Sequence, residues 1–404
     1  MSAITGVLLS SEHDDVRPTS AQGDAPSASG APGTGASRTP SRWKRFGKVA
    51  GWTVVAAVVV GFAVDTAKPL WQHWWFAARM CGGTLASADL ADVLPDERLH
   101  NGTDEVSLEG GGMECVISTD DDHRALSVEV MSGGAGIGRE LDMSFTIPVE
   151  PNYVFPDGTP GFADQFGPVI LQECPKLGRD ELGRKRRLLT RAIGPSTSDE
   201  PSPALLRIAA SAANAASEKS GCGAKRLPLP ERAADLESRP LSEAAGTKEC
   251  GWLADVRLPR NPSGRAWEFA ERSAGDMPIT SCALVDPAKG KGGAPVVEFS
   301  GWYGDWTDEP FEMLLAANVD YPSDRSAQGP LMAEALGRAT AQCDGEAANF
   351  QAYSDPRAND LSERYVTGAQ LRPLLLKFAA EQSRIHGCSG LKLPGKTVYP
   401  MSEN

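Results

Sequence analysis

The hydrophobic pattern changes several times along this chain of 404 residues. Residues 21–40 contain no large apolar side chain, and Ser, Ala, Gly, Pro and Thr dominate the stretch. Such a segment cannot bury enough surface to offset the entropy lost on ordering. We therefore predict that residues 1–48 form a disordered tail, whose end is a basic cluster between Arg38 and Lys48.

A continuous apolar run without charge follows from Val49 to Val64. Its length is near the short limit for a membrane span, and the aromatic residues from Trp71 to Phe76 would suit the far interface. A cleaved signal peptide is the alternative, but the run begins far from the N-terminus and no small-residue cleavage site follows it cleanly. The sequence predicts an uncleaved anchor over residues 49–68. The basic cluster before it places the N-terminus in the cytoplasm and the rest of the chain outside.

Beyond residue 79 the apolar spacing alternates between the periods of strands and helices. The predicted strands are 114–118, 124–131, 187–193, 252–258, 267–271, 279–285, 295–302 and 349–353. The predicted helices are 87–94, 162–174, 202–221, 331–342 and 374–385. The fold class expected from this mixture is α+β, with mainly antiparallel sheets covered by helices.

The spacing of the eight cysteines indicates an internal duplication. The first four are separated by 34, 59 and 48 residues, and the last four by 32, 61 and 45. The set is Cys81, Cys115, Cys174, Cys222, Cys250, Cys282, Cys343 and Cys388. An even number outside the anchor is typical of disulfides in an oxidising compartment. We predict two tandem, disulfide-paired units, residues 79–224 and 225–404.

The alignment of these two units has a rival register. It equates Cys115 with Cys250, because a glutamate precedes each, and makes Cys282 an insertion. Four cysteines allow three pairings per unit, so the spacing leaves the connectivity open. Pairing between sequence neighbours is the simplest arrangement.

Composition and charge limit the classes of partner. With 41% apolar and 23% charged residues, the chain has the values of a globular protein. The net charge of −13 argues against nucleic acid, because phosphate binding needs a basic surface. One basic cluster lies outside: Arg184, Lys185, Arg186, Arg187 and Arg191. It would suit an anionic ligand, but a strand with an exposed charged face is the interpretation we favour.

No sequence motif for a nucleophile, a metal site, a P-loop or a dinucleotide is present. The glycine-rich stretch from Gly133 to Gly138 lacks the dinucleotide fingerprint. His386 follows a predicted helix, where stabilisation of the helix end explains it. We accordingly expect no catalytic residue, no metal and no cofactor.

Aromatic and acidic side chains gather between Phe299 and Phe311. Aromatic rings beside carboxylates suit a sugar face or a cationic ligand. The alternative is that the rings cover the core, since aromatic residues are usually buried. The candidate ligand-binding residues are Trp302, Tyr303, Asp305, Trp306 and Asp308.

The whole layout resembles that of uncharacterised single-pass exported membrane proteins of high-GC Gram-positive bacteria. The resemblance lies in the basic tail, the anchor and the duplicated cysteine-paired region, and it implies no activity. Two functions fit. The first is a non-catalytic extracytoplasmic module held in the cell membrane by one helix, with an envelope protein or a wall component as partner. The second is an exported hydrolase that uses carboxylates, recognisable by two of them about 5–10 Å apart in a cleft.

Overall fold

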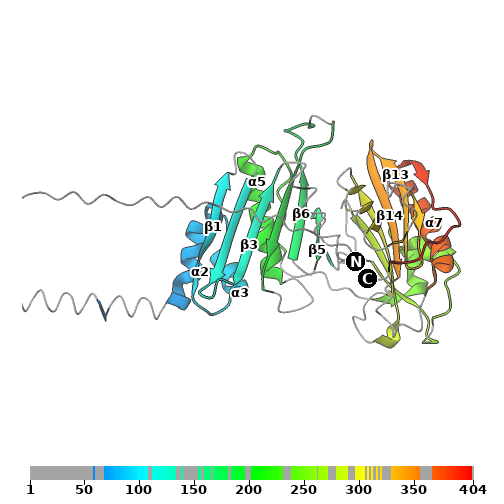
Figure 1. Ribbon diagram of the computed structural model, residues 1–404, viewed down its shortest axis with the longest axis horizontal. Helices are drawn as coiled ribbons and strands as arrows, with labels where there is room; N and C mark the ends of the chain where they lie inside the picture. Colours follow the sequence, from blue (N-terminus) through cyan, green and yellow to red (C-terminus); the bar gives the residue numbers. More distant parts are fainter. Residues whose placement is uncertain are drawn as a thin grey trace, which may run out of the picture. The chain divides into compact units, whose positions relative to one another are not determined.

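A computed structural model describes most of the chain after residue 68 (Figure 1). The described ranges are 68–107, 112–132, 153–155, 159–164, 167–180, 183–195, 202–230, 238–261, 263–271, 279–289, 296–304, 329–354 and 366–402. Isolated described positions are 58–59, 137, 140, 307–308, 311–312, 315–316 and 319–320. Residues 63–404 form one compact unit.

The first sheet has seven antiparallel strands in the order β1-β2-β3-β7-β6-β5-β4. They are β1 (Leu99–Ser107), β2 (Gly112–Thr119), β3 (Arg124–Met131), β4 (Tyr153–Val154), β5 (Gly161–Asp164), β6 (Gly167–Glu173) and β7 (Arg187–Ile193). The α-helices before and after these strands are α2 (Lys68–Arg79), α3 (Ser87–Val93) and α5 (Pro203–Lys219), with a 3₁₀ turn at Met80–Gly83.

Helix α5 covers one face of this sheet, where it packs on β3, β6 and β7 (Figure 1). Ser202 caps its first turn by accepting a hydrogen bond from the Leu205 amide, and Pro203 suits that turn. Small residues of α5 itself, such as Ala209 and Ala212, are fully buried. Their size lets the helix approach the strands closely.

The second sheet has eight strands, in the order β12-β13-β14-β11-β10-β9-β8 with β15 beside β13. They are β8 (Arg239–Pro240), β9 (Glu268–Glu271), β10 (Ile279–Val285), β11 (Val297–Tyr303), β12 (Leu331–Met332), β13 (Leu336–Cys343), β14 (Glu346–Ser354) and β15 (Ser389–Lys392). Helix α7 (Gly368–Ile385) packs on β11, β13 and β14. Three 3₁₀ helices complete this part: η4 (Leu241–Gly246), η5 (Gly251–Asp255) and η6 (Pro287–Lys289).

The two sheets share one strand order. Read along each sheet, β1-β2-β3-β7-β6-β5 corresponds to β9-β10-β11-β14-β13-β12. Cys115 lies within β2 and Cys282 within the corresponding β10, whereas Cys250 directly precedes the 3₁₀ helix η5. The topology therefore favours the register that equates Cys115 with Cys282 over its rival.

Four disulfides join sequence neighbours, as the simplest pairing predicted. They are Cys81–Cys115, Cys174–Cys222, Cys250–Cys282 and Cys343–Cys388. Each bridge stays within residues 79–224 or within residues 225–404, referred to below as the first and second half, and each half contains an antiparallel sheet. The predicted α+β class with antiparallel sheets and disulfides is confirmed.

Two predicted helices are wrong. Residues 162–174 form the hairpin of β5 and β6, and residues 331–342 form β12 and most of β13. A fully buried strand has apolar residues on both faces, so its periodicity does not separate it from a helix. Gly337 shows why tertiary packing prevails over the alanine-rich composition: a Cβ there would lie 2.7 Å from Leu375 of α7. Small residues are needed in β13 because α7 lies directly upon it.

One predicted strand and the start of one predicted helix also differ from the structure. The predicted strand 252–258 is replaced by the 3₁₀ helix η5, which buries Trp252 against Phe299 and Phe378. Helix α7 begins at Gly368 rather than at 374, because a capping box of Thr367 and Gln370 starts it before Pro373.

The predicted tail and almost all of the predicted anchor lie outside the described residues. Within the described ranges, no helix is both long and apolar enough to cross a membrane.

Candidate functional site

Trp302 belongs to an apolar cluster that joins the two sheets. Its ring packs edge-on against Phe162 of β5 and against Phe311, with centroid distances of 5.5 and 5.7 Å. It is 1% exposed, and its Nε1 donates to Ser300 Oγ. Phe299 points to the opposite face of β11, into the core beneath α7. Phe299 and Trp302 thus lie on opposite faces of β11, and the ring of Trp302 is packed inside the protein.

The other candidates from this segment have different positions. Asp308 is half-exposed and accepts a hydrogen bond from Arg338, whose guanidinium is buried. Asp305 and Trp306 lie outside the described residues. Tyr303 lines a cavity. Ligand binding by the five residues together stays a prediction, with Tyr303 as the member best placed for it.

This cavity has a volume of about 360 Å³ and is bounded by residues of both halves. It lies beside the ends of the β6–β7 and β13–β14 hairpins, close to where α7 ends. Its lining comprises Pro160, Leu171, Glu173, Lys185 and Arg187 from the first half, and Tyr303, Gly304, Cys343, Asp344, Glu346 and His386 from the second.

Ion pairs between the halves form one side of the cavity. Arg187 Nη2 lies 2.8 and 2.6 Å from the two carboxylate oxygens of Glu346. Lys185 Nζ lies 3.5 Å from Glu173, 3.2 Å from Asp344 and 3.7 Å from Glu346. Burial alone would lower the pKa of Lys185, but the hydrogen bond to Asp344 and the nearby carboxylates raise it.

The basic cluster identified in the sequence is therefore divided by the fold. Lys185 and Arg187 meet acids of the second half. Arg191 is buried and paired with Glu140, while Arg184 pairs with Asp180. The side chains of Arg187 and Arg191 are only 11% and 4% exposed. The predicted exposed, charged strand face is therefore wrong for these two residues. Their positive charge is neutralised locally.

The exposed charges at the cavity are negative. The side chains of Glu173 and Asp344 are 51% and 89% exposed, whereas those of Lys185, Arg187 and Glu346 are between 8% and 21% exposed. A ligand that approaches from solvent meets carboxylates first. Three carboxylates and two basic side chains leave the lining with an excess of negative charge when His386 is neutral.

Two stacked rings form the opposite wall. The centroids of Tyr303 and His386 are 4.2 Å apart and their planes are inclined by 32°. His386 follows α7 as its C-cap residue, so the predicted position at a helix end is confirmed, but the residue also lines the cavity. Its Nε2 is buried and has no hydrogen-bond partner among the described residues. Burial, and then the charge of Lys248, lower the pKa of His386, which favours the neutral ring.

Polar contacts continue behind this wall. The Tyr303 hydroxyl lies 3.2 Å from Thr280 Oγ1 and donates to Gln382 Oε1. Gln382 Nε2 in turn donates to the backbone carbonyl of Glu249. Burial raises the pKa of the Tyr303 hydroxyl above its ordinary range, so this group stays protonated. Tyr303 is consequently a fixed ring with an internal hydroxyl rather than a proton donor to the cavity.

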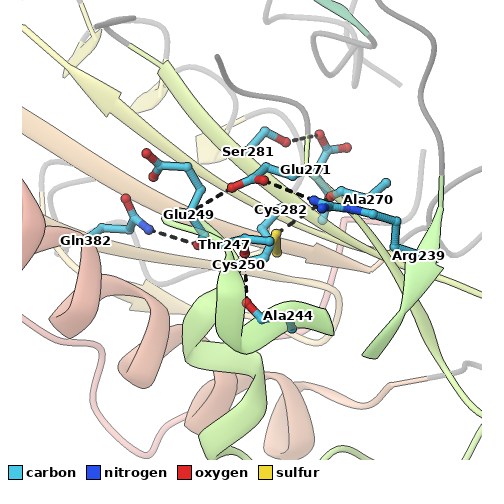
Figure 2. The surroundings of a disulfide bond; sticks show 11 residues. Arg239, Ala244, Thr247, Glu249, Cys250, Ala270, Glu271, Ser281, Cys282 and Gln382 are labelled. Carbon is cyan, nitrogen blue, oxygen red and sulfur yellow. Dashed lines mark hydrogen bonds and ion pairs between the residues drawn. A yellow bond between two sulfur atoms is a disulfide. The ribbon is translucent and has the colours of Figure 1, made fainter. Parts of the chain in front are cut away.

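Figure 2 shows the inner end of this network beside the Cys250–Cys282 disulfide. The Glu249 amide donates to Glu271, which also binds Arg239 from β8. The Glu249 side chain is buried, and its Oε2 has no hydrogen-bond partner among the described residues. Burial raises the pKa of Glu249, and the neighbouring Glu271 adds to that shift although Lys248 opposes it. Hydrogen bonds hold the Glu249 backbone in place, and the ion-pair partner of its buried carboxylate is Lys248, whose Nζ lies 3.6 Å from Oε1.

Several residues of this site escape sequence analysis. Glu173, Asp344 and Glu346 are isolated acids in an acidic chain, and nothing local distinguishes them. The lone signal is that Glu173 and Asp344 are adjacent to Cys174 and Cys343, which the predicted duplication equates.

Among the described residues, no group of three or more His, Cys, Asp and Glu side chains is arranged to hold a metal ion. The chain matches no protein-family model, and no curated protein or solved structure is significantly similar to it.

Proposed function

We propose that this chain is a membrane-anchored, extracytoplasmic binding module without catalytic activity, and that its ligand occupies the cavity beside Lys185 and His386. The observation that supports this most is the cavity itself, which takes its lining from both halves. Four disulfides favour an oxidising compartment outside the cytoplasm. The anchor over residues 49–68, with the N-terminus in the cytoplasm, would place it there.

The ligand that suits this cavity is a small organic cation, such as an amine of the cell envelope. Glu173 and Asp344 offer accessible negative charge, and the Tyr303–His386 pair offers aromatic faces. A cation next to both gains Coulomb attraction and a cation–π contact. We further propose that the two halves arose by duplication and that the cavity is a product of their pairing.

The experiment is a binding measurement on the full chain in lipid nanodiscs. The probes are tetramethylammonium and lysine as cations, with glucose and glucuronate as neutral and anionic comparisons. The cations should raise the unfolding temperature, and the other two should not. Asp344→Asn combined with Glu173→Gln should abolish this rise. Asp255→Asn removes an exposed carboxylate outside the cavity lining and should leave it intact.

Failure of both cations to bind, or binding that survives loss of Glu173 and Asp344, would contradict the cationic ligand. It would leave the membrane topology untouched. That topology has its own test: protease added to intact cells should remove a C-terminal tag and spare an N-terminal one.

A carboxylate hydrolase is the second candidate, because Glu173 and Glu346 both lie within 3.7 Å of Lys185 Nζ. The two oxygens nearest to Nζ are then at most about 7 Å apart, an upper limit that is compatible with the carboxylate spacing of glycosidases. Against it, Glu346 accepts two hydrogen bonds from Arg187, so it is engaged as an ion-pair partner rather than free to donate a proton. Release of reducing ends from isolated cell wall, lost on Glu173→Gln, would support the hydrolase instead.

A further inference from the structure

Helix α2 has one face that belongs to the folded core. Phe76 is fully buried, and Gln72 reaches across to the start of β1. Gln72 Nε2 donates to the Glu97 carbonyl at 2.6 Å, and Gln72 Oε1 accepts from the Leu99 amide at 3.1 Å. The helix is therefore fixed to the first sheet and cannot rotate independently of it (Figure 1).

The other face of α2 presents tryptophan outward. Trp74 is 69% exposed, which makes it the most exposed large apolar side chain among the described residues, and Trp71 is 36% exposed. These two residues are three positions apart on the helix, whereas the neighbouring Trp75 is half-buried and packs against the core of the first half. Large aromatic side chains are usually buried, so their outward position calls for a covering surface.

Positive charge accompanies this tryptophan face. Helix α2 contains no acidic residue, and Lys68 and Arg79 stand at its two ends. The Arg79 guanidinium lies over the Trp75 ring, 5.2 Å from its centroid. Within a chain whose net charge is −13, such a combination is a local exception. Tryptophan with flanking cations is the composition that favours the headgroup region of a membrane.

The sequence also limits where this face can lie. The apolar run ends at Val64, four positions before α2 begins at Lys68. Four residues span at most about 14 Å when fully extended. If Val64 marks the edge of the hydrocarbon layer, α2 must begin within or just above the headgroups.

We infer that α2 is an interfacial helix: its Trp71–Trp74 face docks on the lipid headgroups of the outer leaflet and holds the folded part in one orientation on the membrane. This goes beyond the proposed function, although it rests on the proposed anchor for its proximity to lipid. Because Gln72 and Phe76 attach α2 to the first sheet, lipid contact of the helix would set the direction in which the cavity faces.

The test is quenching of tryptophan fluorescence by brominated phosphatidylcholine. The full chain is reconstituted in vesicles that also contain phosphatidylglycerol. Trp43 and Trp52, which precede α2, are replaced by Phe so that the anchor contributes no signal. In this background we expect clear quenching, and Trp71→Ala with Trp74→Ala should remove most of it. Trp267→Phe, which removes a buried tryptophan of the second half, should leave the quenching unchanged.

Extraction with alkaline carbonate separates this proposal from the anchor. A chain that resists extraction but is quenched equally with and without Trp71 and Trp74 keeps its anchor and overturns the docking helix. A chain that is extracted, yet shows Trp74-dependent quenching beforehand, docks through α2 without an anchor. If the double variant instead halves the particle mass in detergent and leaves quenching unaltered, a second copy covers this face and the lipid proposal is wrong.

Discussion

Arg187 and Glu346 occupy the first positions of two corresponding strands, β7 and β14, and pair with each other across the two halves. The shared strand order thus places opposite charges at equivalent points, where each residue pairs with the other. Lys185 and Asp344, two positions earlier in each half, repeat the arrangement. An apolar cluster that includes Phe162 and Trp302 continues the contact between the sheets. The cavity is a consequence of this pairing, because its polar side consists of these same groups.

The first prediction concerns this ion pair. Arg187→Met or Glu346→Gln alone should lower the free energy of unfolding by about 1.5–3 kcal/mol, because each leaves a charged partner without its hydrogen bonds. The double variant should cost less than the sum of the two. Urea unfolding of all four proteins measures the coupling. The exposed pair Arg384–Glu381 is the control, with a smaller expected coupling because solvent screens it. Equal coupling in both cycles would contradict the role assigned to Arg187.

The second prediction decides between core and ligand contact for Trp302. Trp302→Ala should lower the free energy of unfolding by about 3–5 kcal/mol, because it empties a packed site between Phe162 and Phe311. Thermal unfolding with and without tetramethylammonium reports stability and binding separately. Tyr303→Phe serves as the comparison, since it removes only the internal hydroxyl and keeps the ring at the cavity. A Trp302→Ala variant with wild-type stability and lost binding would show that Trp302 contacts ligand after all.

The third prediction tests the close approach of β5 and β6, which lie where the sequence predicts a helix. Gly161→Ala should destabilise the protein by about 1–3 kcal/mol, because the added Cβ would lie 2.2 Å from the Val169 carbonyl oxygen. Gly112→Ala is a matched strand position with nothing within 4 Å of the new atom. Its effect should stay within about 0.5 kcal/mol. Unfolding midpoints in urea compare the two, and similar losses would argue against the close β5–β6 approach.

Whether a segment's secondary structure is predicted correctly from the sequence depends on a physical property of that segment. Two strands, 124–131 and 187–193, are identified from the sequence to the residue, although most of their side chains are buried. The similarly buried segments 162–174 and 331–342 are misassigned as helices, because the apolar spacing of a segment buried on both faces does not separate a strand from a helix. The even number of cysteines predicts disulfides, but the spacing leaves their connectivity open, and pairing between neighbours is the simplest of three arrangements per half.

Among the described residues, Tyr303 is the one ligand-binding candidate from the sequence that also lines the cavity. Trp302 belongs to the same motif, but strand alternation turns it toward the core between the sheets. The cavity itself depends on residues 159 positions apart, such as Lys185 and Asp344. Such a juxtaposition is a property of how the halves pair, and no local pattern contains it.

The last prediction concerns the pH dependence of stability at Glu249, next to the Cys250–Cys282 disulfide (Figure 2). Burial raises the pKa of Glu249 above its unfolded value, so the folded state binds the proton more tightly. The stabilisation from this group is fully present below about pH 4, near the unfolded pKa of glutamate, and is lost as the pH rises through the folded pKa. Glu249→Gln removes the buried carboxylate. It should therefore raise the unfolding temperature at pH 7 and bring little or no gain at pH 4.

Glu381 on α7 provides a control of opposite sign. Its hydrogen bond from Arg384 lowers the pKa of Glu381, so that group stabilises the fold above its unfolded pKa and loses this effect as the pH falls through the folded pKa. Glu381→Gln should then slightly lower the unfolding temperature at pH 7 and have no effect at low pH. Differential scanning calorimetry at both pH values, without reductant, measures the two variants against the parent. A lower unfolding temperature for Glu249→Gln at pH 7 would mean that the ion pair with Lys248 outweighs the cost of burying the carboxylate, and the expected sign would be wrong.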